Sequence, residues 1–217
     1  MSSVEALRNK LKDAIEQAIA SSRKRKFKQS VELIVVFKDA NPKAPEFKFR
    51  DAIYMPKGLG KPSRVCVVAE GDMLINARKA GADLALSRED VQKMDRKSAK
   101  KIAQSCDWVL VRADLMPIAG RILGPALGPR GKAPTPIPMN ANIEDLIKRY
   151  RNTTRFRNKE QSFVSGKIGS EDMSINDLVE NAIAALTHIE NKIKRPLIYS
   201  SRIYVKTTMG PPIEVLL

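Results

Sequence analysis

The middle of the chain alternates short apolar runs with helical segments, and this alternation constrains the fold more than any other feature. Runs at 65–69, 84–86 and 108–111 have the length and composition of buried strands. Between them lie segments with helical periodicity, one of which begins after the capping residue Ser87. Strands that are separated by helices pair in parallel. The segment from Arg64 onward therefore predicts a parallel α/β domain.

The two ends of the chain each hold a helix and strands but too few residues for a separate core. Ser2 and Glu5 have the spacing of a capping box in front of an amphipathic helix, and strands are expected over 29–37 and around 47–54. The last third predicts two strands flanking 158–161, a long helix that starts near Ser174 and Asp177, and a strand over 198–206. We infer that both ends combine into one domain.

The predicted domain boundaries follow from this combination. Residues 1–63 and 158–217 form the first domain, and residues 64–157 form an inserted second domain. A cluster of Pro and Gly over 56–62 marks the first crossing. A stretch over 116–138 that is dense in Gly and Pro is expected to be a rigid connector, followed by a short helix near 142–150.

The charge balance makes polyanions the leading class of partner. Lys and Arg number 39 against 24 Asp and Glu, which gives a formal charge of +15 and a pI of about 9.9. An anionic membrane is the competing polyanion, but no apolar run approaches the ~20 residues of a spanning helix, and no hydrophobic signal segment follows Met1. We expect a cytosolic protein that binds nucleic acid and has no membrane partner.

Catalytic and metal-binding residue types are scarce. The two cysteines, Cys66 and Cys106, are too few for a disulfide framework and lack metal-ligand spacing, so we expect both to be reduced, inert packing residues. The single histidine, His188, lies in a helical segment, where a structural role is expected, and it excludes any site that needs two imidazoles. We predict no cofactor, no metal site and no enzymatic activity.

The glycine-rich segment resembles a phosphate-binding loop only in part. Lys132 follows four spaced glycines, but Ala133 stands where such a loop needs a hydroxyl for magnesium, and the prolines remove amide donors; these glycines are Gly120, Gly124, Gly128 and Gly131. A nucleotide-dependent enzyme is therefore the weaker alternative. We favour a connector that touches a phosphate backbone through Arg130 and Lys132.

A basic turn over 23–28 holds five positive charges around Phe27. Such a run is also typical of a solvated helix end. An aromatic ring inside it either joins the core through the next strand or packs against the sugar or base of an RNA. Burial of Phe27 is the simpler alternative, and contact with RNA is the functional one.

The stretch from Lys206 to Pro212 follows a predicted strand. Its structural interpretation is a tight turn in which Gly210 takes a positive φ. Its functional interpretation is that Gly210 lets an RNA backbone approach while threonine hydroxyls bond to ribose 2′-hydroxyls. Aromatics make up only 5% of the chain, which argues against successive base stacking and favours recognition of folded RNA by shape.

Three motifs together resemble the ribosomal protein L-one family, most closely its archaeal branch. They are FKQSVE at 27–32, MPIAGRILGPALGPRGKAPTPIP at 116–138 and TTMGP at 207–211, and the similarity in order and spacing spans nearly the whole chain. The resemblance implies a two-domain α/β protein. Both termini build a split α/β first domain, and the middle forms an inserted Rossmann-like three-layer α/β second domain, joined by a hinge.

The resemblance also implies a function. Members of the family bind a folded region of large-subunit ribosomal RNA and form the mobile lateral stalk near the exit site, where deacylated tRNA leaves. Many also bind their own mRNA and repress its translation. The expected partners are therefore stalk-region ribosomal RNA, exit-site tRNA and the protein's own mRNA, with a monomer when the protein is free.

The family's RNA contacts fall by motif on the first domain. Glu32 is unusual beside a polyanion, but a carboxylate accepts hydrogen bonds from ribose hydroxyls or base amino groups. The sequence departs from the family pattern near Arg202, so no contact is expected there. The implied RNA-binding residues are Lys26, Phe27, Ser30, Glu32, Arg50, Thr208, Met209 and Gly210, with Lys28 and Thr207 as neighbours.

Overall fold

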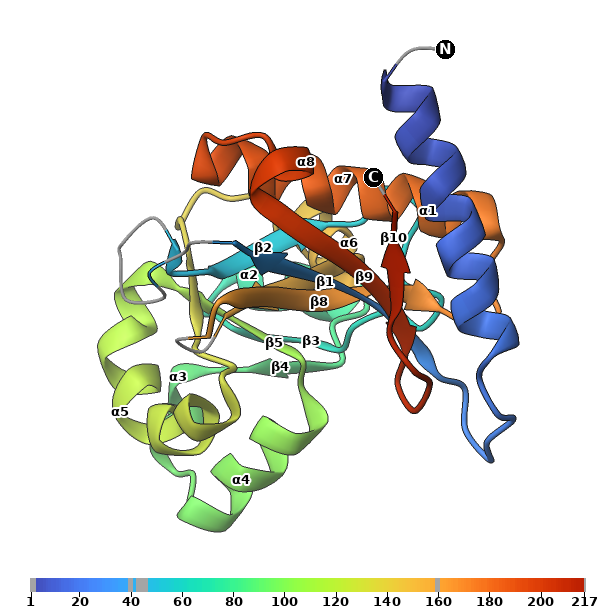
Figure 1. Ribbon diagram of the computed structural model, residues 1–217. Coiled ribbons are helices and arrows are strands. Elements are labelled where there is room, and N and C mark those ends of the chain that lie inside the picture. Colours follow the sequence, from blue (N-terminus) through green and yellow to red (C-terminus); the bar gives the residue numbers. More distant parts are fainter. Residues whose placement is uncertain (1–2, 39–40, 42–46, 159–160, 217) are drawn as a thin grey trace. The chain divides into compact units, whose positions relative to one another are not determined.

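The computed structural model (Figure 1) describes residues 3–38, 41, 47–158 and 161–216. The chain divides into two compact units: unit 1 comprises Met1–Pro62 and Asn152–Leu217, and unit 2 comprises Ser63–Arg151. The second crossing lies at 152 rather than at the expected 158. The reason is that β7 (Thr153–Arg157) pairs with β2 (Arg50–Tyr54) and so belongs to the sheet of unit 1.

Unit 1 is a six-stranded sheet with two long helices packed on one face. The strands are ordered β10-β9-β1-β8-β7-β2, and every pair is antiparallel. The helices share one apolar core with the sheet. Besides β2 and β7, unit 1 contains α1 (Ser3–Ala20), β1 (Ser30–Phe37), β8 (Phe163–Ser170), α7 (Ile175–Ile193), α8 (Leu197–Ser200), β9 (Ser201–Thr207) and β10 (Ile213–Val215).

The two faces of this sheet differ in composition. Along β1, Val31, Leu33, Val35 and Phe37 are buried against the helices, while the alternate residues are half-buried on the other face. We call that second face the outer face; it carries Ser30, Glu32, Ile34 and Val36 together with their cross-strand partners. The period-two pattern arises because successive side chains of a strand point to opposite sides.

Unit 2 is a three-layer arrangement around a parallel sheet of order β4-β3-β5-β6. Helices α2 and α6 share a core with one face, and α3, α4 and α5 share a core with the other. This confirms the predicted α/β class and the parallel inserted sheet. The elements are β3 (Val65–Val68), α2 (Asp72–Lys79), β4 (Leu84–Leu86), α3 (Arg88–Gln92), α4 (Arg96–Ser105), β5 (Trp108–Arg112), α5 (Met116–Leu127), β6 (Thr135–Ile137) and α6 (Ile143–Arg151).

The expected rigid connector after Met116 was wrong, because its first half is the helix α5. Pro117 lies in the first turn, where a missing amide proton costs nothing, although Pro125 lies inside the helix. Ala119, Leu123, Ala126 and Leu127 recur at helical spacing and are buried. Burial of this apolar stripe outweighs the low helix propensity of Gly and Pro.

Three further differences concern short elements. The strand expected over 198–206 begins only at Ser201, because α8 occupies the preceding turn. The helix α4, capped by Asp95, and the strand β10 were not predicted. The Ser174 cap of α7 and the Ser87 cap of α3 are present, whereas Ser2 lies outside the described residues.

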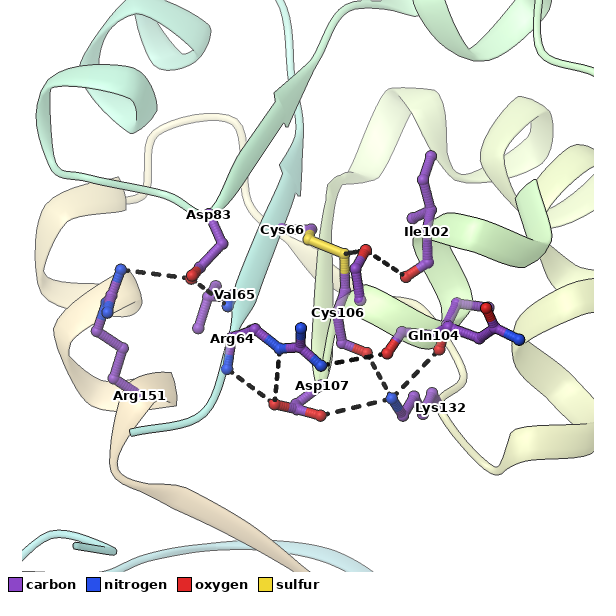
Figure 2. The surroundings of a disulfide bond; sticks show 12 residues. Arg64, Val65, Cys66, Asp83, Ile102, Gln104, Cys106, Asp107, Lys132 and Arg151 are labelled. Carbon is purple, nitrogen blue, oxygen red and sulfur yellow. Dashed lines mark hydrogen bonds and ion pairs between the residues drawn. A yellow bond between two sulfur atoms is a disulfide. The ribbon is translucent and has the colours of Figure 1, made fainter. Parts of the chain in front are cut away.

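The prediction of two reduced cysteines was also wrong. Figure 2 shows a disulfide between Cys66 and Cys106, whose Cα atoms are 5.8 Å apart. Cys66 lies in β3, and Cys106 lies between α4 and β5, the strand that pairs with β3. Both are buried, as expected of packing residues. The separation of 40 residues carried no local signal of this pairing.

Candidate nucleic-acid interface

The basic turn and the TTMGP turn meet at one end of the unit 1 sheet. Antiparallel pairing of β1 with β9 sets Val31 opposite Thr207, so the segments before β1 and after β9 are adjacent (Figure 1). The Ser30 amide donates to Thr208 Oγ1 at 3.0 Å, and the Thr208 amide donates to the Ser30 carbonyl at 3.0 Å. We call this region the loop end; it comprises 22–30, 170–172 and 207–211.

Gln29 holds the loop end together, and the sequence offered no signal for this role. Its side chain is 1% exposed. Nε2 donates to Ser22 Oγ at 2.7 Å, to the Arg23 carbonyl at 3.2 Å and to Glu171 Oε2 at 3.1 Å. Oε1 accepts from the Met209 amide at 3.0 Å. One buried amide therefore links three segments that are distant in the chain.

Thr207 and Gly210 support the turn from inside. Thr207 is fully buried and its hydroxyl donates to Ser22 Oγ at 2.9 Å, so its side chain is not available to a partner in this structure. A Cβ on Gly210 would lie 2.4 Å from Thr207 Oγ1. The expected positive φ at Gly210 was wrong, since its φ is not positive. Glycine is required there by the close approach of Thr207.

Two large apolar side chains of the loop end point into solvent. Phe27 is 51% exposed and Met209 is 58% exposed. The alternative in which Phe27 joins the core is therefore wrong. All basic residues from Arg23 to Lys26 are exposed as well. The surface combines cations with apolar groups that have no partner in the core, a composition typical of RNA-binding surfaces.

Lys28 differs from its basic neighbours because it forms an ion pair with Asp172. Hydrogen bonds from the Lys28 ammonium and the Ser170 hydroxyl lower the pKa of Asp172 to about 2. The same carboxylate raises the pKa of Lys28. Lys28 is therefore paired within the protein, although both side chains of this pair remain largely exposed to solvent.

Glu32 lies on the outer face between two lysines. In the register of the sheet it stands opposite Lys206 on β9 and Lys167 on β8. Directly opposed side chains of unlike charge stabilise a strand pair. Lys206 also donates to the Thr208 carbonyl at 3.0 Å, so this row of three charged side chains is connected to the loop end. The carboxylate is thus balanced locally and leaves a net positive surface.

Arg50 is not part of the loop end. It lies on β2, which is separated from β1 by β8 and β7, and its register partner is Arg157. Three strand spacings correspond to about 14 Å. Arg50 and Glu32 share the outer face of the sheet, where Glu32 and Arg157, the register partner of Arg50, line a polar cavity.

The glycine-rich segment of unit 2 uses its lysine internally. Lys132 Nζ donates to the carbonyls of Cys106 at 2.7 Å and Ala103 at 3.2 Å and lies 3.4 Å from Asp107 (Figure 2). These carbonyls are at the C-terminal end of α4, where a cation is stabilised by the helix dipole. Arg130 likewise donates to the Ala126 carbonyl at 2.9 Å. Neither side chain is arranged to cradle a phosphate.

His188 takes part in an ion-pair cluster on the core side of β2. Its Nε2 lies 3.1 Å from Asp51, which also accepts from Lys192 at 2.7 Å. Burial alone would raise the pKa of Asp51, but the hydrogen bonds from Lys192 and His188 bring it below its usual value. The cluster joins α7 to the edge strand, which is a structural role.

The part of the chain that the structure describes shows neither a metal site nor a membrane-spanning helix. No three His, Cys, Asp or Glu side chains there are grouped as a metal ion would require. None of the described helices has the length and apolar character needed to cross a membrane.

A profile of the ribosomal protein L1p/L10e family matches residues 16–211. The chain belongs to this family. It is 52% identical over 209 residues to a protein of Staphylothermus marinus, and this alignment covers 96% of the chain and 97% of the relative. It is 51% identical over 207 residues to a protein of Aeropyrum pernix, and that alignment covers 94% of each. A relative from Archaeoglobus fulgidus is 40% identical over 211 residues, covering 96% of this chain and 98% of the relative. All three are named large ribosomal subunit protein uL1.

Membership of the L1p/L10e family confirms the resemblance to archaeal members that the three motifs indicated. It also confirms that the chain is not an enzyme, because the family consists of structural ribosomal proteins. The matched region contains every residue of the predicted site, from Lys26 to Gly210.

Proposed function

We propose that the chain is a noncatalytic constituent of the large ribosomal subunit, located in the cytoplasm within the ribosome, that binds ribosomal RNA through the loop end of unit 1. The observation that carries this proposal is the convergence of the basic turn and the TTMGP turn, which share one buried glutamine and expose Phe27 and Met209. Its family membership and the names of its relatives support the same partner.

Each part of the loop end has a distinct role in this proposal. The exposed cations from Arg23 to Lys26 supply affinity for phosphates, which carries little sequence information. Phe27 and Met209 pack against sugars or bases that the folded RNA presents. The contacts of Gln29 and Thr208 hold these groups in place before binding, which reduces the entropy lost on association.

The finer assignment follows the family motifs. In the proposal, the bound RNA is the region of the mobile lateral stalk near the exit site, and the protein assists the release of deacylated tRNA there. It also binds a mimic of that RNA in its own mRNA and represses translation when in excess. The free protein is a monomer.

We expect Thr208→Val to weaken binding of a stalk-region ribosomal RNA fragment by about 1–3 kcal/mol, because the Ser30 amide loses its acceptor. Lys26→Ala should instead lower the dependence of log affinity on log salt by ~1, because it removes one phosphate contact. Both are measured by titration over a salt series. Equal affinity of the wild type for an unrelated RNA duplex would contradict specific recognition.

We expect Asp172→Asn to raise RNA affinity about two- to threefold at low salt, because Lys28 gains a free charge beside the RNA. Because the pKa of Asp172 is about 2, this carboxylate stays ionised even in mildly acidic binding buffers. A change of pH therefore does not break the pair, and the substitution is needed to test it. Glu16→Gln is the matched control, since Glu16 is exposed on α1. An affinity equal to that of the control would show that Lys28 does not contact RNA.

A further inference from the structure

The disulfide of unit 2 is enclosed by the protein in the folded state. Cys66 is 1% exposed, and Cys106 is fully buried. Both belong to a core that also contains Ile102 and Ala103 of α4. Thiol–disulfide exchange requires a thiolate to reach one of the two sulfurs, so its rate depends on access. Reduction of this bond therefore requires part of unit 2 to move.

The C-terminal end of α4 lies directly beside the disulfide, because Cys106 is the residue that ends the helix (Figure 2). Carbonyl groups in the last turn of a helix have no partner further along the helix. Here the Cys106 amide donates to the Ile102 carbonyl at 2.9 Å, and Arg64 Nη2 donates to the Gln104 carbonyl at 3.3 Å. We call residues 102–107 the α4 terminus.

Lys132 of the glycine-rich segment holds the α4 terminus in place. Its Nζ donates to the carbonyls of Cys106 at 2.7 Å and Ala103 at 3.2 Å and lies 3.4 Å from Asp107. An ammonium group has three donor hydrogens, which matches these three acceptors. The preceding residue, Gly131, has a φ of 66°, a conformation that favours glycine. The turn before Lys132 thus directs this side chain to the backbone of Cys106.

A disulfide in the cytoplasm needs protection from reductants. The chain belongs to a family of ribosomal proteins, which work in that compartment. Cytoplasmic thiols keep most protein cysteines reduced, so burial favours the persistence of this bond. Proteins also open locally at free energies below that of global unfolding. Gln104 and Ser105 are exposed, so the α4 terminus lies at the surface of unit 2 and can open without the sheet.

We propose that the Cys66–Cys106 disulfide is a redox site guarded by Lys132, which a reductant reaches when the α4 terminus leaves Lys132. A dithiol then attacks Cys106 Sγ as a thiolate, which forms a mixed disulfide and releases the Cys66 thiolate. The second sulfur of the dithiol displaces the Cys106 thiolate and closes a cyclic disulfide. The two cysteines gain two electrons and two protons, and the dithiol loses them.

This redox site acts on unit 2 alone. Unit 1 contains no cysteine, so RNA binding by the loop end plays no part in the inference. Conditions that open the α4 terminus, such as heat, make the bond reducible. The reduced unit then loses the constraint that the disulfide places on its unfolded chain. The stability of unit 2 therefore depends on whether it has opened in the presence of a reductant.

The test measures how fast dithiothreitol releases thiols from the native full-length protein. We expect the wild type to react on the order of a hundredfold more slowly than oxidised glutathione, because the bond reacts only in the open state. Lys132→Met should react about tenfold faster than the wild type, since two carbonyls lose their donor. Lys100→Met is the matched control, because it removes an exposed cation from the same helix, and it should react like the wild type.

Ile147→Val separates opening of the α4 terminus from unfolding of all of unit 2. Ile147 is 1% exposed and belongs to the core on the other side of the sheet. The substitution should lower the unfolding midpoint reported by Trp108 fluorescence while the rate of reduction stays within about twofold of the wild type. Circular dichroism verifies folding, and Lys132→Gln replaces Lys132→Met, with faster reduction expected again, if that variant does not fold.

Three outcomes would overturn the proposal. Acceleration by Ile147→Val and Lys132→Met in proportion to their loss of unfolding free energy would show that the bond reacts through global unfolding. A rate for Lys132→Met equal to that of Lys100→Met would show that Lys132 does not guard the bond. Reduction of the wild type as fast as oxidised glutathione, or two free thiols in the native protein, would show that no protected disulfide exists.

Discussion

Loss of the Cys66–Cys106 disulfide is expected to lower the free energy of unfolding of unit 2 by about 4 kcal/mol. The bond closes a loop of 40 residues in the unfolded chain, and the loop-entropy account assigns about this value to a loop of that length. Both sulfurs belong to a core that also contains α4 and α5, so release of the loop acts on the whole unit. Unit 1 contains no cysteine and should keep its RNA affinity.

Trp108 makes this measurement specific to unit 2. It is the single tryptophan of the chain, is 4% exposed and lies in β5, so its fluorescence follows unit 2 alone. Equilibrium unfolding in urea is compared with and without reductant. Cys66→Ala/Cys106→Ala should match the reduced wild type and should not respond to reductant. A wild-type midpoint that reductant leaves unchanged would show that the disulfide contributes nothing.

Gln29→Ala is expected to lower RNA affinity at least tenfold, more than the loss of any single exposed cation. The substitution removes the acceptor of the Met209 amide and the donor to Ser22 and Glu171 in a buried setting. Each polar group left unpaired costs about 1–3 kcal/mol, so the two turns should separate or become mobile. Phe27 and Met209 then lose their common arrangement without being changed themselves.

Gln17→Ala is the matched control, because it removes the same side chain from an exposed position on α1. Both variants are titrated with the stalk-region RNA fragment, and circular dichroism verifies that the sheet remains folded. The Trp108 unfolding transition of unit 2 should be unchanged in both. If Gln29→Ala binds as tightly as Gln17→Ala, the buried amide does not organise the site.

Local features of the sequence predicted most elements because local contacts decide them. The Ser87 and Ser174 caps accept hydrogen bonds from amides three residues away, and the alternating burial of β1 follows from its own pleat. The same reasoning failed for α5, whose glycines and prolines favour a connector when tertiary burial is ignored. It also failed for β7, whose place in unit 1 depends on pairing with β2.

The sequence by itself determined the α/β class, the family, and the two turns that we assign to RNA binding, namely the basic turn and the TTMGP turn. It could do so because patterns, motifs and charge are properties of short stretches. Only the tertiary structure decided how these parts meet. Gln29 is hydrogen-bonded to Met209 across 180 residues, and Cys66 forms a disulfide with Cys106 across 40. Lys132 donates to carbonyls at the end of α4 and is not positioned to bind a phosphate. Such contacts form between segments that only the folded chain brings together, and burial then makes them strong.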